Sequence, residues 1–216
     1  MQSSLARRAA LALALAAGSA AVHAQDAIKI VGVYELSGAG ASAGTYFKDG
    51  VELAVKEINA NGGILGKKIV STVADTQTQP GVAKGLAAKA VDDEAFAVFG
   101  PVFSGSIMVS MAETQRAEVP NFTGGEAAAI TQKGNPYIFR TSFTQASAMP
   151  KVAKYIAGGL KARTVAVMFV NNDFGKGGRD AITKALEANG VKVVADISTD
   201  SRSEEHTSEL QSRYVI

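Results

Sequence analysis

The stretch IKIVGVYELSGAGASAGTYFKDGVELAVKEINANGG, residues 28–63, indicates the fold class. Its first seven residues form a short run that is rich in β-branched side chains and predicts a strand at 28–34. From Val51 to Ile58 apolar residues recur at helical spacing, so we expect an amphipathic helix that ends at Asn61. A strand that leads into a helix is the unit from which parallel sheets are built.

The same alternation continues along the chain. We expect further strands at 68–74, 95–99, 119–122, 137–139, 164–170 and 191–197. We expect further helices from Pro80 to Val91 and at 106–116, 148–160 and 176–189. This order predicts an α/β protein with a parallel sheet between two layers of helices. The polar stretch at 141–148 suggests a boundary between a first lobe at 25–145 and a partial second lobe at 146–201.

Both ends of the chain differ from its body. Residues 1–24 have the layout of a secretory signal peptide, with a basic start, an apolar run and the small-residue cleavage site Val-His-Ala, so we expect export to the periplasm. Residues 202–216, RSEEHTSELQSRYVI, resemble a translated sequencing-library adapter. We therefore expect this tail to be an artefact and the natural protein to continue beyond Ser201 with a different sequence. The alternatives are a natural solvated tail or a weak metal site at Glu205, His206 and Glu209.

Composition argues against several functions. The chain has no cysteine, and its two histidines lie in the end segments, so disulfides and thiolate catalysis are excluded and the commonest general base is missing from the body. We therefore expect no enzyme, no cofactor and no metal. The formal net charge of +2 gives no sign of a nucleic-acid partner.

Four loops follow predicted strands, where open parallel sheets bind their ligands. The first contains G-x-G-x-x-A at 38–43, a pattern found in dinucleotide sites. Its glycines come several residues after the strand, and Asp75 lies too far along to hold a ribose. A flexible glycine loop that gates a ligand is the other interpretation.

The remaining loops carry polar groups. Ser104 or Ser106 is expected to cap the helix after 100–103, and the free amides of that helix start would suit a carboxylate, although capping alone explains the serines equally well. In the loop 123–127, Glu126 either pairs with a ligand ammonium or sits in the first turn of a short helix. In the loop 171–177, Phe174 either covers an apolar ligand or packs under its own loop.

Together these loops resemble a known family. The segment 28–69, ADTQTQP (74–80), VFGPVFSGS (98–106), VPNFTGG (119–125) and NNDFGKGGRDAITKALEANGVKVV (171–194) are similar, in this order, to branched-chain amino-acid-binding proteins of the type I periplasmic binding protein family. The resemblance covers about residues 27–200. It implies two α/β lobes that close on a ligand and deliver it to ABC permease and ATPase subunits. It also implies that the binding protein is a monomer.

The resemblance also implies a set of ligand-binding residues. These are Ala43, Val102, Phe103, Ser104, Thr123, Gly124, Gly125, Glu126 and Phe174. The family often has an aromatic residue at Ala43 and a tyrosine at Phe174, and its third loop is one residue longer, so the ligand stays open among amino acids, amides and aromatic acids. In the family, the rest of the second lobe supplies further ligand-binding groups, and this sequence has no counterpart of it. We therefore expect the 216-residue chain to bind weakly or not at all. A sensory module of the same fold and a nucleotide-dependent α/β enzyme are the alternative functions.

Overall fold

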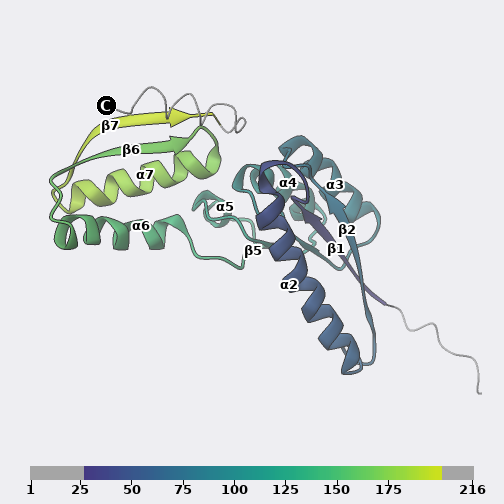
Figure 1. Cartoon of the computed structure of the whole chain (residues 1–216). Coiled ribbons are helices and arrows are strands. Elements are labelled where there is room, and N and C mark those ends of the chain that lie inside the picture. The colour runs from purple at the N-terminus through teal and green to yellow at the C-terminus, as the bar shows by residue number, and fades with distance from the viewer. Residues whose placement is uncertain (1–26, 201–216) are drawn as a thin grey trace, which may run out of the picture.

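The computed structural model describes residues 27–200 (Figure 1). The predicted signal peptide at 1–24 and the adapter-like tail at 202–216 lie outside the described residues. Within 27–200, no helix combines the length and the apolar character that a membrane span requires.

Strands and helices alternate throughout the described part. The strands are β1 (Ile28–Tyr34), β2 (Ile69–Asp75), β3 (Ala97–Phe99), β4 (Asn121–Thr123), β5 (Ile138–Arg140), β6 (Thr164–Val170) and β7 (Lys192–Thr199). The α-helices are α2 (Ala41–Ala60), α3 (Pro80–Asp92), α4 (Ser104–Arg116), α5 (Ala129–Gln132), α6 (Gln145–Lys154) and α7 (Asp173–Ala188). A 3-10 turn at Gly38–Gly40 precedes α2, and a π turn at Tyr155–Gly159 follows α6.

The first lobe is built on a five-stranded parallel sheet in the order β2-β1-β3-β4-β5. β1 and β2 pair along their whole length, from Ile28 beside Ile69 to Tyr34 beside Asp75. The expected α/β class and parallel sheet are confirmed. Because all five strands run the same way, the loops that follow them emerge at one edge of the sheet.

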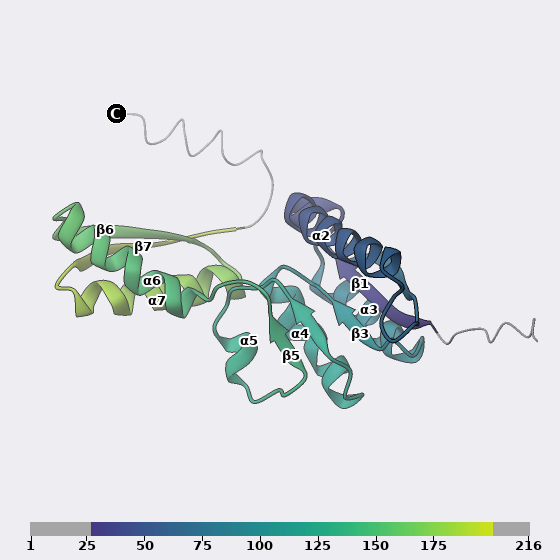
Figure 2. The ribbon, with the colours of Figure 1, turned by 90° about the horizontal axis from the view of Figure 1, so that it is seen from below.

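Helices cover both faces of this sheet. On one face, α2 packs its apolar side, including Val55, against Ile30 of β1 and Ile69 of β2. On the other face, Ala90 of α3 packs with Val33 and Val98. Figure 2 shows α2 on one side of β1 and α3 and α4 on the other. The three layers place the core on both sides of the sheet.

The second lobe consists of the parallel pair β6-β7 with α6 and α7 on one face (Figure 1). Its core contains Ala153 of α6, Leu186 of α7 and Val191 just before β7, all nearly inaccessible. Met168 and Val194 are exposed to 64% and 58%. In the described residues this sheet therefore has an uncovered apolar face.

Two predicted boundaries differ from the structure for identifiable reasons. α6 begins at Gln145 and not at 148, because the hydroxyl of Thr144 accepts a hydrogen bond from the Ser147 amide at 3.0 Å and caps the helix. α2 begins at Ala41, within the expected glycine loop. Neither segment has an apolar periodicity by which a helix start could be recognised.

Candidate functional site

Four loops of the first lobe, which follow β1, β2, β3 and β4, and the start of α7 surround a cavity of about 520 Å³. A cavity of this size lies within the usual range for small-molecule sites. It is lined by Gly38, Ala39, Ala43, Gln77, Thr78, Pro80, Val102, Phe103, Ser104, Gly105, Ser106, Gly124, Glu126, Asn172 and Phe174. Most predicted site residues therefore share one cavity, while Thr123 and Gly125 lie outside its lining.

The start of α4 contributes main-chain amides. Phe103 is the N-cap, and it makes no side-chain capping bond, so the expected capping by Ser104 or Ser106 is wrong. Instead the Ser104 hydroxyl accepts a hydrogen bond of 3.3 Å from the Ala127 amide, which joins the second loop to the third. The amides of the first helical turn have no partner within the helix. They begin at Ser104, which lines the cavity, and they are suited to an anionic group.

The third loop is held by Arg140 of β5. The Arg140 guanidinium donates to the main-chain oxygens of Gly125 and, at 2.9 Å, Ala127. Thr123 is fully buried, and its hydroxyl has no hydrogen-bond partner among the described residues. Its main-chain oxygen accepts from the Thr141 amide at 2.9 Å. Ligand contacts by Thr123 and Gly125, like those of the other predicted site residues, remain predictions.

Glu126 is the one charged residue in the lining of this cavity. The alternative that placed it in the first turn of a short helix is wrong, because α5 begins at Ala129. Burial raises the pKa of its carboxyl, and the nearby Arg140 opposes that shift. Arg140 donates its hydrogen bonds to main-chain oxygens, and among residues 27–200 no ion pair joins it to Glu126.

The first loop is hydrogen-bonded to the end of β2 and to the residues that follow it, and its expected flexibility stays a prediction. Thr78 accepts a hydrogen bond from the Gly40 amide at 3.0 Å and donates one to the Ser37 oxygen at 2.6 Å. The Asp75 carboxylate accepts from the Ser37 hydroxyl and from the Leu36 and Ser37 amides. These bonds, led by that of the Ser37 hydroxyl, lower the pKa of Asp75. The turn places Ala43 at the cavity wall.

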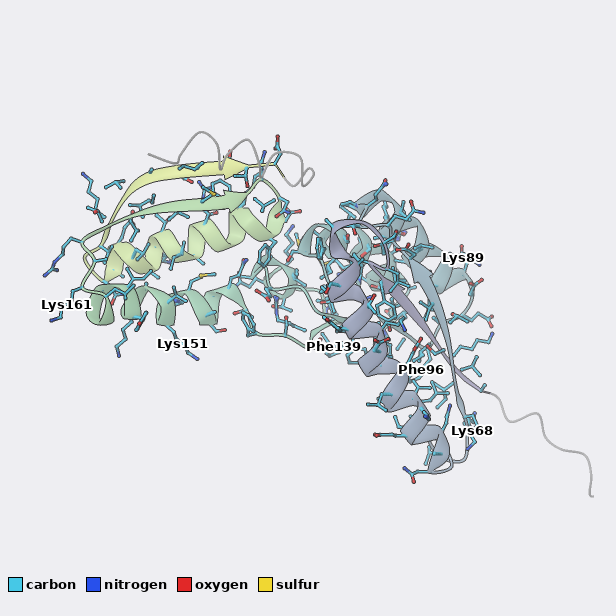
Figure 3. All side chains as sticks on the ribbon, in the orientation of Figure 1. Lys68, Lys89, Phe96, Phe139, Lys151 and Lys161 are labelled. Atoms are coloured by element: carbon cyan, nitrogen blue, oxygen red, sulfur yellow. The ribbon has the colours of Figure 1, made fainter. Side chains whose placement is uncertain are left out.

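Lysine side chains contribute no positive charge to the cavity lining. Figure 3 shows Lys68, Lys89, Lys151 and Lys161 projecting outward from the two lobes. Glu126 is therefore the charged side chain of this lining, and the start of α4 brings main-chain amides to the same cavity.

The sequence profile of a periplasmic binding protein family matches residues 27–212. The chain belongs to this family. The Leu/Ile/Val-binding protein BraC3 of Rhizobium johnstonii is 34% identical over 179 residues, which cover 82% of this chain and 48% of that protein. The leucine-specific-binding protein of Salmonella typhimurium is 31% identical over 188 residues, which cover 85% of this chain and 49% of that protein.

Solved structures agree on the type I periplasmic binding protein fold. LivJ, a branched-chain amino acid transporter substrate-binding protein from Streptococcus pneumoniae in complex with isoleucine, aligns with a TM-score of 0.77 and 27% identity, over 88% of this chain and 55% of that one. A solute-binding protein from Rhodopseudomonas palustris in complex with 3,4-dihydroxybenzoic acid aligns at 0.77 and 23%, over 87% of this chain and 51% of that one. This periplasmic binding protein chain spans about half the length of the relatives it matches.

In this periplasmic binding protein chain, Phe174 lies in the first turn of α7 and not in the preceding loop. The Asn172 side chain caps that helix by accepting a hydrogen bond from the Gly175 amide at 2.9 Å. Phe174 is 44% exposed and lines the cavity from the second lobe.

Gln145 connects the two lobes at the cavity, and the sequence pattern missed it. Its main-chain N–H donates to the main-chain oxygen of Glu126 at 3.1 Å, and its side-chain Nε2 donates to the main-chain oxygen of Phe174 at 2.8 Å. A Cβ on Gly177 or Gly178 would lie 2.9 or 3.0 Å from the Gln145 side chain. The glycine pair is thus the sequence signal that could have revealed a close neighbour.

Proposed function

We propose that this chain is the ligand-capturing part of a periplasmic solute-binding protein that serves an ABC importer. The ligand is a small amino acid, or a related amide or carboxylate, held between the lobes. The names of the relatives support this class, and the cavity supports the chemistry. Delivery to membrane permease and ATPase subunits, export to the periplasm and a monomeric state belong to the same proposal.

The observation that carries the proposal is the arrangement of charge in the cavity. The amides that begin at Ser104 suit a carboxylate, while Glu126 suits an ammonium group. Phe103 and Phe174 bring apolar surface to the same cavity, one from each lobe. This combination fits a zwitterion with an apolar side chain.

A binding panel tests the proposal. Calorimetric titration of the full 216-residue chain would use leucine, leucinamide, isocaproate (leucine without its amino group) and benzoate. We expect leucine to bind more tightly than isocaproate, because only leucine has an ammonium group for Glu126. Because the chain spans about half the length of its relatives, we expect weak binding and use millimolar concentrations, at which heat from none of these compounds would contradict the proposal.

An aromatic acid is the second candidate ligand. The Rhodopseudomonas palustris neighbour holds 3,4-dihydroxybenzoic acid, and Phe103 and Phe174 offer ring surfaces in this cavity. Tighter binding of benzoate than of leucine in the same titration would favour this candidate. The alternative of a nucleotide-dependent enzyme has less support, because the glycine motif at 38–43 contains a turn held by Thr78.

A further inference from the structure

Glu35 follows directly on β1 and is completely buried, although it carries a carboxyl group. Its Oε2 accepts a hydrogen bond of 2.9 Å from the Val102 amide, and its Oε1 accepts one of 3.1 Å from the Phe103 amide. Each carboxyl oxygen thus accepts one main-chain N–H, as an ionised carboxylate does. Glu35 therefore joins the end of β1 to the residues that immediately precede α4.

No cation compensates this carboxylate directly. Among residues 27–200, no lysine or arginine forms an ion pair with Glu35. The main-chain amides before α4 are its hydrogen-bond partners. The start of α4, which faces the cavity, therefore already has one negative charge next to it.

The glycines of the first loop make room for Glu35. A Cβ on Gly40 would lie 2.8 Å from the Cβ of Glu35, and a Cβ on Gly44 would overlap the main-chain oxygen of Glu35. The spacing of Gly40 and Gly44 thus has a packing explanation, because Gly40 leaves room for the side chain of Glu35 and Gly44 leaves room for its main chain.

We propose that Glu35 is a positioning and specificity-determining residue. It fixes the Val102–Phe103 turn so that the following amides face the cavity, and its charge disfavours ligands that carry a carboxylate without an ammonium group. This inference rests on the proposed function for its ligand preference. Its positional part concerns the free chain alone.

The physical reason is repulsion at short range. A ligand carboxylate on the first amides of α4 would lie within about 10 Å of the Glu35 carboxylate, since each hydrogen bond spans about 2.9 Å and consecutive residues are about 3.8 Å apart. A zwitterion offsets this repulsion with its own ammonium group and with the attraction of that group to Glu126. An anion such as isocaproate has no such compensation.

Three variants separate these roles. Glu35→Gln keeps the size of the side chain but replaces one acceptor oxygen with a donor, Glu35→Asp is too short to reach both amides, and Glu113→Gln is the matched control. Glu113 is also acidic and buried, being 8% exposed, but it pairs with Lys84 of α3 and with Arg116 of α4. Every variant is made in the full 216-residue chain.

The first readout is amide hydrogen exchange by NMR, without ligand. In the wild-type chain we expect both the Val102 and the Phe103 amide to be protected, although they precede the helix. In Glu35→Gln and Glu35→Asp at least one of the two should exchange about tenfold faster, as expected when a hydrogen bond is lost. Glu113→Gln should leave both unchanged. Unprotected amides in the wild-type chain would overturn the positional role even if the Glu35 variants fail to fold.

The second readout is the ratio of leucine to isocaproate affinity. We expect Glu35→Gln to reduce this ratio about tenfold by relieving the repulsion of isocaproate, while Glu113→Gln keeps the wild-type ratio. A merely structural role would weaken both probes alike, and an unchanged ratio would overturn the specificity role. If the wild-type chain binds neither probe, the proposed function and the specificity role both fail, while the exchange data still decide the positional role.

Discussion

The side-chain nitrogen of Gln145 donates a 2.8 Å hydrogen bond to the main-chain oxygen of Phe174 and so attaches the start of α6 to the cavity wall of the second lobe. The amide of the same residue donates to Glu126 in the first lobe. One buried residue thus contacts the two cavity residues that offer an aromatic ring and a negative charge. The geometry of the cavity therefore depends on the segment between the lobes.

Replacement of Gln145 by Met should loosen α7 at the cavity with little cost in global stability. The variant loses the bond to Phe174, but it also removes an Oε1 that is buried without a partner. We expect a change in unfolding free energy within about 1.5 kcal/mol and faster amide exchange in the first turn of α7. Gln115→Met, an exposed change in α4, is the control. Unchanged exchange at Phe174 and Gly175 would show that Gln145 does not hold this turn.

Two glycines of α2 should respond in opposite directions to alanine. A Cβ at Gly44 would collide with the main chain of Glu35, whereas a Cβ at Gly50 would meet nothing within 4 Å. We expect Gly44→Ala to destabilise the chain by about 1–3 kcal/mol and Gly50→Ala to stabilise it by about 0.5–1 kcal/mol. Urea denaturation measures both. Equal effects at the two positions would contradict the described contact with Glu35.

The raised pKa of Glu126 predicts a pH effect on stability. Because burial raises its pKa, the folded chain binds this proton more tightly than the unfolded chain does. The contribution to stability is therefore complete below the pKa of an unfolded glutamate and is lost as the pH rises through the higher folded value. Glu126→Gln should remove this pH dependence, whereas Glu57→Gln, an exposed change in α2, should keep it. Urea denaturation at a series of pH values is the measurement, and identical profiles for wild type and Glu126→Gln would contradict the shift.

Ile107 should be a principal contributor to the stability of the first lobe. It is 0% exposed and packs with Met111, Ile130 and Ile138. Ile107→Ala should cost about 2–5 kcal/mol, because it deletes buried methyl groups and leaves a cavity. Val109 is 39% exposed on the same helix, so Val109→Ala should change the unfolding free energy by less than about 1 kcal/mol. Similar losses for the two variants would show that α4 does not pack as described.

The main architecture was predictable because local patterns encode it. β1 was predicted at its observed bounds, and Pro80 opens α3 as expected. β3 and β4 are shorter than expected, because ladder pairing and not residue type sets where a strand ends.

The residues that complete the site were not predictable from local patterns. Glu35 and Gln145 belong to residue types that usually lie at the surface. Their burial depends on partners 67 and 29 residues away in the sequence. Only the glycines packed against them, such as Gly40 and Gly177, hinted at these contacts.

The most direct test of the central claim is an NMR titration of the full 216-residue chain with leucine and, separately, with isocaproate. If the cavity holds a zwitterion between the start of α4 and Glu126, leucine at millimolar concentration should shift the amide signals of Ser104, Gly105 and Glu126. Isocaproate should shift them less, and the Glu126→Gln variant should respond to the two compounds alike. The account would be contradicted if leucine left these signals in place, or if isocaproate shifted them as strongly in the wild-type chain.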